Sequence, residues 1–254
     1  MGNYEQEFYE IPKKVRTPIW PLMFLFTYLF LGIAHTSMSV SLLNGTYLSL
    51  YTLSLLVVAF LIVLLCLKVK TKLLSVPFAL FVAIEIAGII RDCIILTKEA
   101  PLVKDRIEVY ITLVTIYGIS ILAQMVALVC YGSVFFSSTM LYTDRYKAHK
   151  KTINIVFYVF LGLNFVFLAV GILASVIIML AYLAGDIKTF LEYFVTYNII
   201  NSIKMTVEVM SEESKGLIVK ESFAIAKMCI MLFSYAGLFF TKRWIDRPYK
   251  RVIE

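Results

Sequence analysis

The chain has few residues that could build a metal or catalytic centre. Its 254 residues include only two histidines, His35 and His149, and four cysteines, and the H-E-x-x-H, G-x-S-x-G and P-loop patterns are all missing. The topology predicted below places the two histidines on opposite sides of a bilayer, where they cannot share a metal ion. The sequence therefore predicts no catalytic residue, no metal and no cofactor, and we do not expect an enzyme.

Cysteines in loops, where a disulfide could form, are missing as well. Each of the four lies inside an apolar run, at Cys66, Cys93, Cys130 and Cys229. A cysteine embedded in a membrane helix mostly acts as a small hydrophobic side chain. The sequence therefore predicts no disulfide, and its cysteines do not indicate a redox compartment.

Charged residues are scarce and apolar residues abundant. Charged residues make up 16% of the chain and apolar residues 61%, with a mean hydropathy of +0.86, whereas soluble domains are typically about 45–50% apolar. Runs of about 18 or more apolar residues are typical of membrane helices. We therefore predict an all-α integral membrane protein with six transmembrane helices in a lipid bilayer. Because the connections are short, we expect a single membrane domain. The six runs are Ile19–Leu42, Tyr47–Leu67, Leu73–Leu96, Val109–Phe135, Ile153–Leu183 and Leu217–Phe240.

The basic residues gather in alternate connections. Basic residues concentrate on the cytoplasmic side of membrane proteins, so we predict an N-in, C-in topology. It comprises a cytoplasmic tail at 1–17, a six-span domain at 18–241 and a basic cytoplasmic tail at 242–254. This distribution accounts for the net charge of +7 without nucleic acid as a partner. Fifteen of the 24 Lys and Arg residues lie on the predicted inner side: Lys13, Lys14, Arg16, Lys68, Lys70, Lys72, Arg145, Lys147, Lys150, Lys151, Lys242, Arg243, Arg247, Lys250 and Arg251.

The longest connection, Gly185–Gly216, lies on the predicted outer side. Its first half has apolar residues at helical spacing, but only eleven residues, Tyr193–Ile203, run without charge, and these are too few to span a bilayer. We predict an amphipathic helix in the outer interface; a small loop packed on the helix ends is the alternative. Asn44 begins an Asn-Gly-Thr sequon on the same side, a possible glycosylation site in a turn so tight that the membrane would block modification.

Two charges fall where lipid is expected, Glu85 in the third run and Lys227 in the sixth. With a helical rise of 1.5 Å per residue, Glu85 lies roughly 18 Å beyond the start of its run and Lys227 roughly 15 Å. In a hydrocarbon core about 30 Å thick, both lie near the midplane or somewhat outside it, at matching depths. An ion pair between them is possible if the two helices touch.

A charge at this depth usually faces a partner, a cavity or a pathway. His35 lies at a similar depth, and Asp92 follows Glu85 by seven residues on the same helix face, so we assign all four residues to one buried polar layer. One hypothesis is a polar path or binding pocket, with Glu85 as the acid, Lys227 as its counter-ion and His35 as a proton relay. The other is an ion pair that only locks two helices together. The sequence leaves both open.

A second polar layer is predicted nearer the cytoplasm. It consists of Gln124 in the fourth run and Asn164 in the fifth. Neutral polar side chains of this kind often form hydrogen bonds between membrane helices, which contribute about 0.6–2 kcal/mol each. We therefore expect these two residues to join neighbouring helices.

Val15-Arg16-Thr17 lies directly before the first span, and the basic turn Lys70–Lys72 leads into Leu73, Leu74 and Pro77 before the third. These two stretches resemble the lysosome-associated protein transmembrane family and its tetraspan-like relatives. The resemblance covers residues 13–145, four of the six spans, and implies an endosomal or lysosomal membrane. Tyr249-Lys250-Arg251-Val252 is similar to a tyrosine-based endosomal sorting signal, with Tyr249 and Val252 as its defining residues; the alternative is a basic tail at an anionic lipid surface.

These observations favour a multi-pass membrane protein that acts as a small transporter, channel or receptor-like subunit. The polar layer at Glu85 and Lys227 would then handle a small ion or solute. The alternative is a non-enzymatic, tetraspan-like scaffold or adaptor, with another membrane protein or a second copy of the chain as its partner. The predicted location is the plasma membrane or an endosomal or lysosomal membrane.

Overall fold

The computed structural model describes residues 17–43, 50–69, 72–103, 107–140, 144–185 and 212–246, and over these residues the protein is helical. Short 3-10 helices, Lys72–Leu74 and Ala100–Val103, flank the third long helix. The all-α prediction is therefore confirmed for the described part of the chain. The long helices are α1 (Ile19–Leu43), α2 (Leu50–Cys66), α3 (Ser75–Glu99), α4 (Ile107–Thr139), α5 (Asp144–Gly185) and α8 (Glu212–Asp246).

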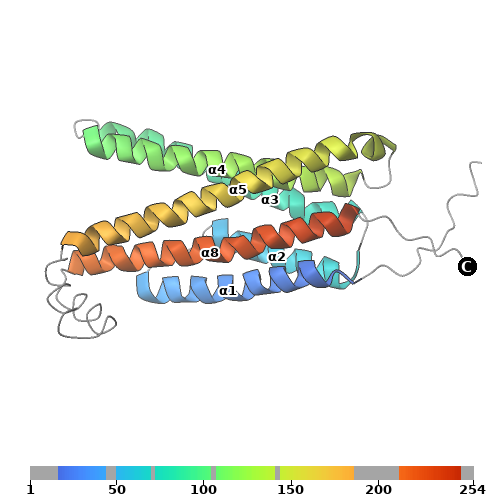
Figure 1. Ribbon diagram of the computed structural model, residues 1–254, viewed down its shortest axis with the longest axis horizontal. Helices are drawn as coiled ribbons and strands as arrows, with labels where there is room; N and C mark the ends of the chain where they lie inside the picture. The colour runs from blue at the N-terminus through green and yellow to red at the C-terminus, as the bar shows by residue number, and fades with distance from the viewer. Residues whose placement is uncertain are drawn as a thin grey trace, which may run out of the picture.

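The helices form an antiparallel ring. From α1 to α5, each helix packs against the next in the chain, and α8 closes the ring by packing against both α5 and α1. We call one end of the bundle the Lys242 end; α1 and α5 begin there and α8 ends there. The other is the Arg91 end, where α1 and α5 end and α8 begins. At the Arg91 end, on the left of Figure 1, α4 diverges from α5 and α8.

Five of the helices are long and apolar enough to cross a membrane: α1, α3, α4, α5 and α8. Their outward faces carry large apolar side chains such as Phe30 (75% exposed) and Leu173 (59% exposed), as expected for helices that contact lipid. The chain is thus a multi-pass membrane protein. The predicted second span, Tyr47–Leu67, corresponds to α2, which has 17 residues and is somewhat shorter than the roughly 20 residues that a spanning helix needs.

Several helices extend beyond the apolar runs. Helix α5 begins at Asp144, nine residues before the predicted start, and α8 runs from Glu212 to Asp246. The backbone hydrogen bonds of a helix do not require apolar side chains, so a run marks the lipid-crossing part of a helix and not its ends. The tail predicted from residue 242 needs correction, because its first five residues belong to α8. Asn44, most of Gly185–Gly216, Tyr249 and Val252 lie outside the described residues.

The contact between α1 and α8 depends on a glycine. A Cβ atom added to Gly237 would lie 2.6 Å from Cδ2 of Leu25 and 3.6 Å from its backbone nitrogen. Beside this contact, Phe24 of α1 stacks on Phe240 of α8 with ring centroids 5.2 Å apart. Small residues let membrane helices approach closely, and in lipid such packing replaces the hydrophobic effect as a source of association.

We expect Gly237→Ala to destabilise the bundle. The added methyl must displace Leu25 or separate α1 from α8, and overpacking of this kind typically costs about 1–3 kcal/mol. The matched control is Gly162→Ala on α5, where an added Cβ meets nothing within 4 Å, so the better helix propensity of alanine should leave stability equal or higher. Unfolding by SDS in mixed micelles measures both. Equal stabilities for the two variants would contradict the close approach.

Candidate functional site

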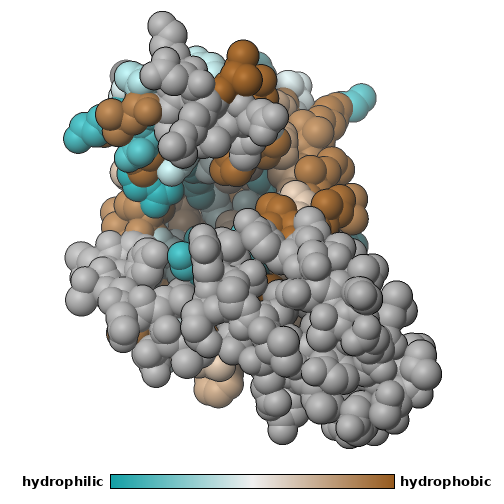
Figure 2. Space-filling view, turned by 90° about the vertical axis from the view of Figure 1, so that its left-hand side faces the viewer, coloured by the Kyte–Doolittle hydropathy of each residue, from teal (hydrophilic) through white to brown (hydrophobic). Residues whose placement is uncertain are grey.

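Lys227 of α8 faces the interior of the ring and is nevertheless exposed. Ser234 and Thr241 follow it by seven and fourteen residues, and so lie on the same helix face; both are buried, at 7% and 0% exposure. Lys227 itself belongs to the exposed class. Its inward-facing side chain therefore borders accessible space at the Arg91 end, and Figure 2, which views the molecule from that end, shows the surface hollowed there. We call this space the chamber.

The ammonium group of Lys227 rests on an aromatic ring. Its Nζ lies 5.1 Å from the ring centroid of Tyr51, which belongs to α2, whereas the helices that pack against α8 are α1, α5 and, less extensively, α4. A cation over a ring face gains about 0.5–2 kcal/mol, depending on how far it is desolvated. The contact holds the amine inside the ring of helices without neutralising its charge.

His35 of α1 is held by α8. Its Nε2 lies 3.0 Å from the backbone oxygen of Phe223, and because a carbonyl only accepts, Nε2 carries the hydrogen. The other ring nitrogen, Nδ1, is buried and has no hydrogen-bond partner among the described residues. The contacts place His35 against Phe223 and against the edge of Tyr51, with ring centroids 5.5 and 6.0 Å apart, and give it no hydrogen bond to Glu85.

A hydrogen-bonded chain joins α1 to α2 beside the chamber. The hydroxyl of Ser54 donates to the backbone oxygen of Tyr51 at 2.6 Å. The Tyr28 hydroxyl, 3.3 Å from Ser54 Oγ, is therefore the donor in that contact. Tyr28 is buried, and its ring also packs edge-on against the Tyr51 ring on which Lys227 rests, with centroids 6.4 Å apart.

Glu85 of α3 also faces inward. Phe78 and Asp92, seven residues before and after it on the same helix face, are both buried, whereas Glu85 is half-buried. Within the described part of the chain, Glu85 has no hydrogen bond and no ion pair within 4.0 Å. It interacts with Lys227 only through space. The direct ion pair required α3 and α8 to touch, and the ring order keeps the two helices from packing along each other.

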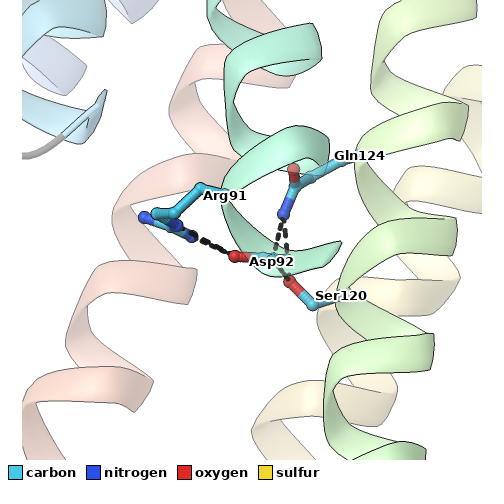
Figure 3. A network of polar contacts seen from close by, with 4 residues as sticks. All are labelled: Arg91, Asp92, Ser120 and Gln124. Atoms are coloured by element: carbon cyan, nitrogen blue, oxygen red, sulfur yellow. Dashed lines mark hydrogen bonds and ion pairs between the residues drawn. The ribbon is translucent and has the colours of Figure 1, made fainter. Parts of the chain in front are cut away.

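Asp92 lies at the centre of a polar network that joins α3 to α4 (Figure 3). Its Oδ1 accepts hydrogen bonds from Nε and Nη2 of Arg91, at 2.9 and 2.7 Å. Its Oδ2 accepts from Ser120 Oγ at 2.7 Å and from Gln124 Nε2 at 2.6 Å. Asp92 is 1% exposed. Its charge is thus fully compensated, and this carboxylate stabilises a helix pair and is not free for a ligand.

The assignment of Gln124 to an inner layer with Asn164 needs correction. Gln124 bonds to Asp92, and its Oε1 lies directly against Gly88 of α3. Asn164 of α5 instead donates to Cys130 Sγ of α4 at 3.3 Å. Position 130 is six residues beyond Gln124, or roughly 9 Å along the helix axis. Each polar side chain therefore bonds to a different neighbouring helix at a different depth.

A second charged cluster, at the Lys242 end, was missed by the sequence analysis, which assigned Lys242 to a tail. Lys242 is 0% exposed, and its Nζ donates to Asn154 Oδ1 at 2.6 Å and to Asp246 Oδ2 at 2.5 Å. Lys150 Nζ donates to the backbone oxygen of Asp246 at 3.0 Å. These bonds hold α5 and α8 together at this end. The signal in the sequence was the i, i+4 spacing of Lys242 and Asp246, with Trp244 and Ile245 between them.

Comparison of the chain with protein-family models, curated proteins and solved structures finds no match. The resemblance to the lysosome-associated protein transmembrane family therefore stays a prediction. Over the described helices, no three His, Cys, Asp or Glu side chains gather in a way that would hold a metal ion. What the chamber offers chemically is one unpaired carboxylate, one unpaired ammonium and an aromatic wall.

The chamber predicts that position 227 is open to water-soluble reagents. In a background with Cys66, Cys93 and Cys229 replaced by alanine, Lys227→Cys in lipid nanodiscs should react rapidly with a charged methanethiosulfonate. Cysteines at two control positions show whether a fast reaction at position 227 reflects contact with water. Ser234→Cys lies on the same face but is buried, and Val166→Cys on α5 is exposed only on the outside of the ring; both should react at least about tenfold more slowly, because a charged reagent is excluded from the core and from lipid.

Reactivity is measured by mass spectrometry of the intact protein over time. A reaction rate for Lys227→Cys no higher than that of Val166→Cys would mean that Lys227 faces lipid. The inference of a water-accessible chamber would then be wrong. Glu85→Cys provides a second position on the opposite wall and should react as Lys227→Cys does.

The network around Asp92 predicts a large stability effect. Asp92→Ala removes four hydrogen bonds from a buried carboxylate, and hydrogen bonds to charged groups contribute about 1.5–3 kcal/mol each. We expect a loss of more than about 2 kcal/mol in the free energy of unfolding in mixed micelles. Glu99→Ala, at the exposed end of the same helix, should change stability by less than about 0.5 kcal/mol. Similar losses for the two variants would show that the network does not hold α3 to α4.

Proposed function

We propose that the protein binds a small polar solute in the chamber between α3 and α8, as a transporter or a receptor-like protein of the membrane. The observation that supports this most directly is Lys227, an inward-facing and accessible ammonium without an ion-pair partner in the described structure. Glu85, on the opposite wall, has the same property with the opposite charge. Two side chains that only locked helices together would bond to each other, as Lys242 of α8 and Asn154 of α5 do.

The depth of these residues supports a functional role. Lys227 lies 15 residues from the start of α8 and 19 from its end, and Glu85 lies 10 and 14 residues from the ends of α3. Both are thus in the middle part of a membrane helix. A charged side chain there is costly, by at least about 2.5–3.5 kcal/mol even on scales from biological insertion. Residues of this kind usually mark the path or the binding site of a solute.

The Lys242 end favours a transporter or a receptor over an open channel. The buried cluster of Lys242, Asn154 and Asp246 fills that end, together with buried Trp244 and Ile245. A channel conducts through a continuous path, whereas a chamber that buried side chains block at one end fits one state of an alternating-access transporter or the pocket of a receptor. With the predicted N-in, C-in topology, the blocked end faces the cytoplasm and the Arg91 end faces the outer side of the membrane.

The proposal predicts that a small charged solute stabilises the protein. Thermal unfolding in nanodiscs is measured with alanine, propionate, ethylamine, inorganic phosphate and glucose as probes. At least one charged probe should raise the unfolding temperature, because a ligand at 100 times its Kd adds about 2.7 kcal/mol of stability. Lys227→Met or Glu85→Gln should abolish the shift.

Matched controls carry the same substitutions outside the chamber. Lys98→Met and Glu99→Gln, at the exposed end of α3, should keep the shift seen with the unsubstituted protein. A scaffold or adaptor, the alternative function, would show no shift with any probe. That result, together with an unreactive Lys227→Cys, would overturn the proposed function.

A further inference from the structure

We infer that the solute is a small zwitterion of the amino-acid type, with its anionic group bound to Lys227 and its ammonium group bound to Glu85. The inference rests on the proposed function and names the chemical class that the chamber selects. It is carried by the arrangement of four charged side chains on α3 and α8.

The four charges divide into one satisfied pair and one unsatisfied pair. Arg91 and Asp92 neutralise each other through two hydrogen bonds, and Ser120 and Gln124 occupy the second carboxylate oxygen. Lys227 and Glu85 remain, one of each sign, with no ion-pair partner in the described helices. The chamber is therefore neutral as a whole but holds two separated charges of opposite sign.

A zwitterion is the ligand that leaves no charge uncompensated. An anion bound to Lys227 would leave Glu85 as an unpaired negative charge at membrane depth, and a cation bound to Glu85 would leave Lys227. A bound anion or cation would therefore displace water from a site in which one charge still lacks a counter-charge. A molecule with both groups pairs with both side chains at once, and neutral amino acids are the simplest molecules of this kind.

The geometry places the two groups on opposite walls. Glu85 projects from α3, and Lys227 projects from α8 with its amine held over Tyr51. Their charged atoms are more than 4.0 Å apart, yet near enough to interact through space. A bridging ligand adds a charge-assisted hydrogen bond of about 2.7–2.9 Å at each end. Because the two side chains do not reach each other, each is left to bond to a ligand in the chamber.

Arg91 does not turn the chamber into an anion site. Its guanidinium extends towards α8 in Figure 3, and its charge acts on Lys227. Both its Nε and its Nη2, however, donate to Asp92, so the fork that commonly binds carboxylate or phosphate is already used. An anionic ligand would have to compete with an intramolecular carboxylate for it.

Matched ligands test the charge requirement. Binding to the full chain in nanodiscs is measured by isothermal titration with two zwitterions, alanine and 4-aminobutyrate, which differ in the separation of their charges. Each is compared with analogues that lack one group: propionate and ethylamine for alanine, butyrate and propylamine for 4-aminobutyrate. We expect one zwitterion to bind at least about tenfold more tightly than both of its analogues, the effect of losing one charged hydrogen bond.

Charge-swap variants test the two positions. Lys227→Met and Glu85→Gln should each weaken binding of that zwitterion at least about tenfold. The double variant Glu85→Lys with Lys227→Glu reverses both charges, and binding should return to within about tenfold of the original, because the ligand can bind in the opposite orientation. The conservative variants Lys227→Arg and Glu85→Asp should retain binding. If the charge-swapped protein does not fold, these conservative variants still test whether binding requires the charge at each position.

The outcomes separate this inference from the proposed function. If propionate binds as tightly as alanine and needs only Lys227, the chamber binds anions, and the zwitterion inference is wrong while the proposed function stands. If ethylamine binds as tightly as alanine and needs only Glu85, the chamber binds cations, and again the zwitterion inference is wrong while the proposed function stands. If neither zwitterion binds, the inference fails; if no probe binds and Lys227→Cys is unreactive as well, the proposed function fails with it.

Discussion

Charge compensation inside a membrane bundle is the constraint on which the rest of this structure depends. A charged side chain in the middle of a lipid-spanning helix is stable only with a partner, with water or with both. The protein meets this requirement in three ways. Asp92 is bonded by three side chains from two helices, and Lys242 is bonded by Asn154 and Asp246. Glu85 and Lys227 instead have no ion-pair partner among the described residues and face the space that we call the chamber.

The order of the helices decides which of these solutions each residue can use. Because α3 packs against α4, Asp92 can reach Ser120 and Gln124. Because α5 packs against α8, Lys242 can reach Asn154. Helices α3 and α8 face each other across the ring, so Glu85 and Lys227 are left apart. The close approach of α1 to α8 at Gly237 joins these two helices of the ring, whereas at the Arg91 end α4 diverges from α5 and α8 (Figure 1), and Glu85 and Lys227 are left without an ion-pair partner among the described residues.

Much of this architecture could be predicted from the sequence, since apolar runs give the helices and charged interruptions give the buried polar positions. Glu85 and Lys227 were both identified in this way. The pairing of polar residues could not be predicted. Gln124 and Asn164 lie on adjacent helices in the chain, yet each bonds to a different neighbour, because hydrogen bonds depend on helix rotation and relative depth. Lys242 was assigned to a tail because it begins the cluster of basic residues at 242–251, which is typical of an exposed cytoplasmic segment, and only tertiary packing buries it.

Helix α8 connects the chamber to the Lys242 cluster at the other end of the bundle. Lys227 and Lys242 lie on the same helix, 15 residues or roughly 22 Å apart along its axis, and Ser234 and Thr241 follow Lys227 on its inward face. A ligand that draws Lys227 towards Glu85 therefore pulls on α8 as a whole, since a helix transmits axial and rotational displacement along its length. The Lys242 cluster opposes such a movement, because it binds α8 to α5 through Asn154. Any displacement of α8 that begins at Lys227 would therefore have to strain or break the bonds of Lys242 at the other end of the helix.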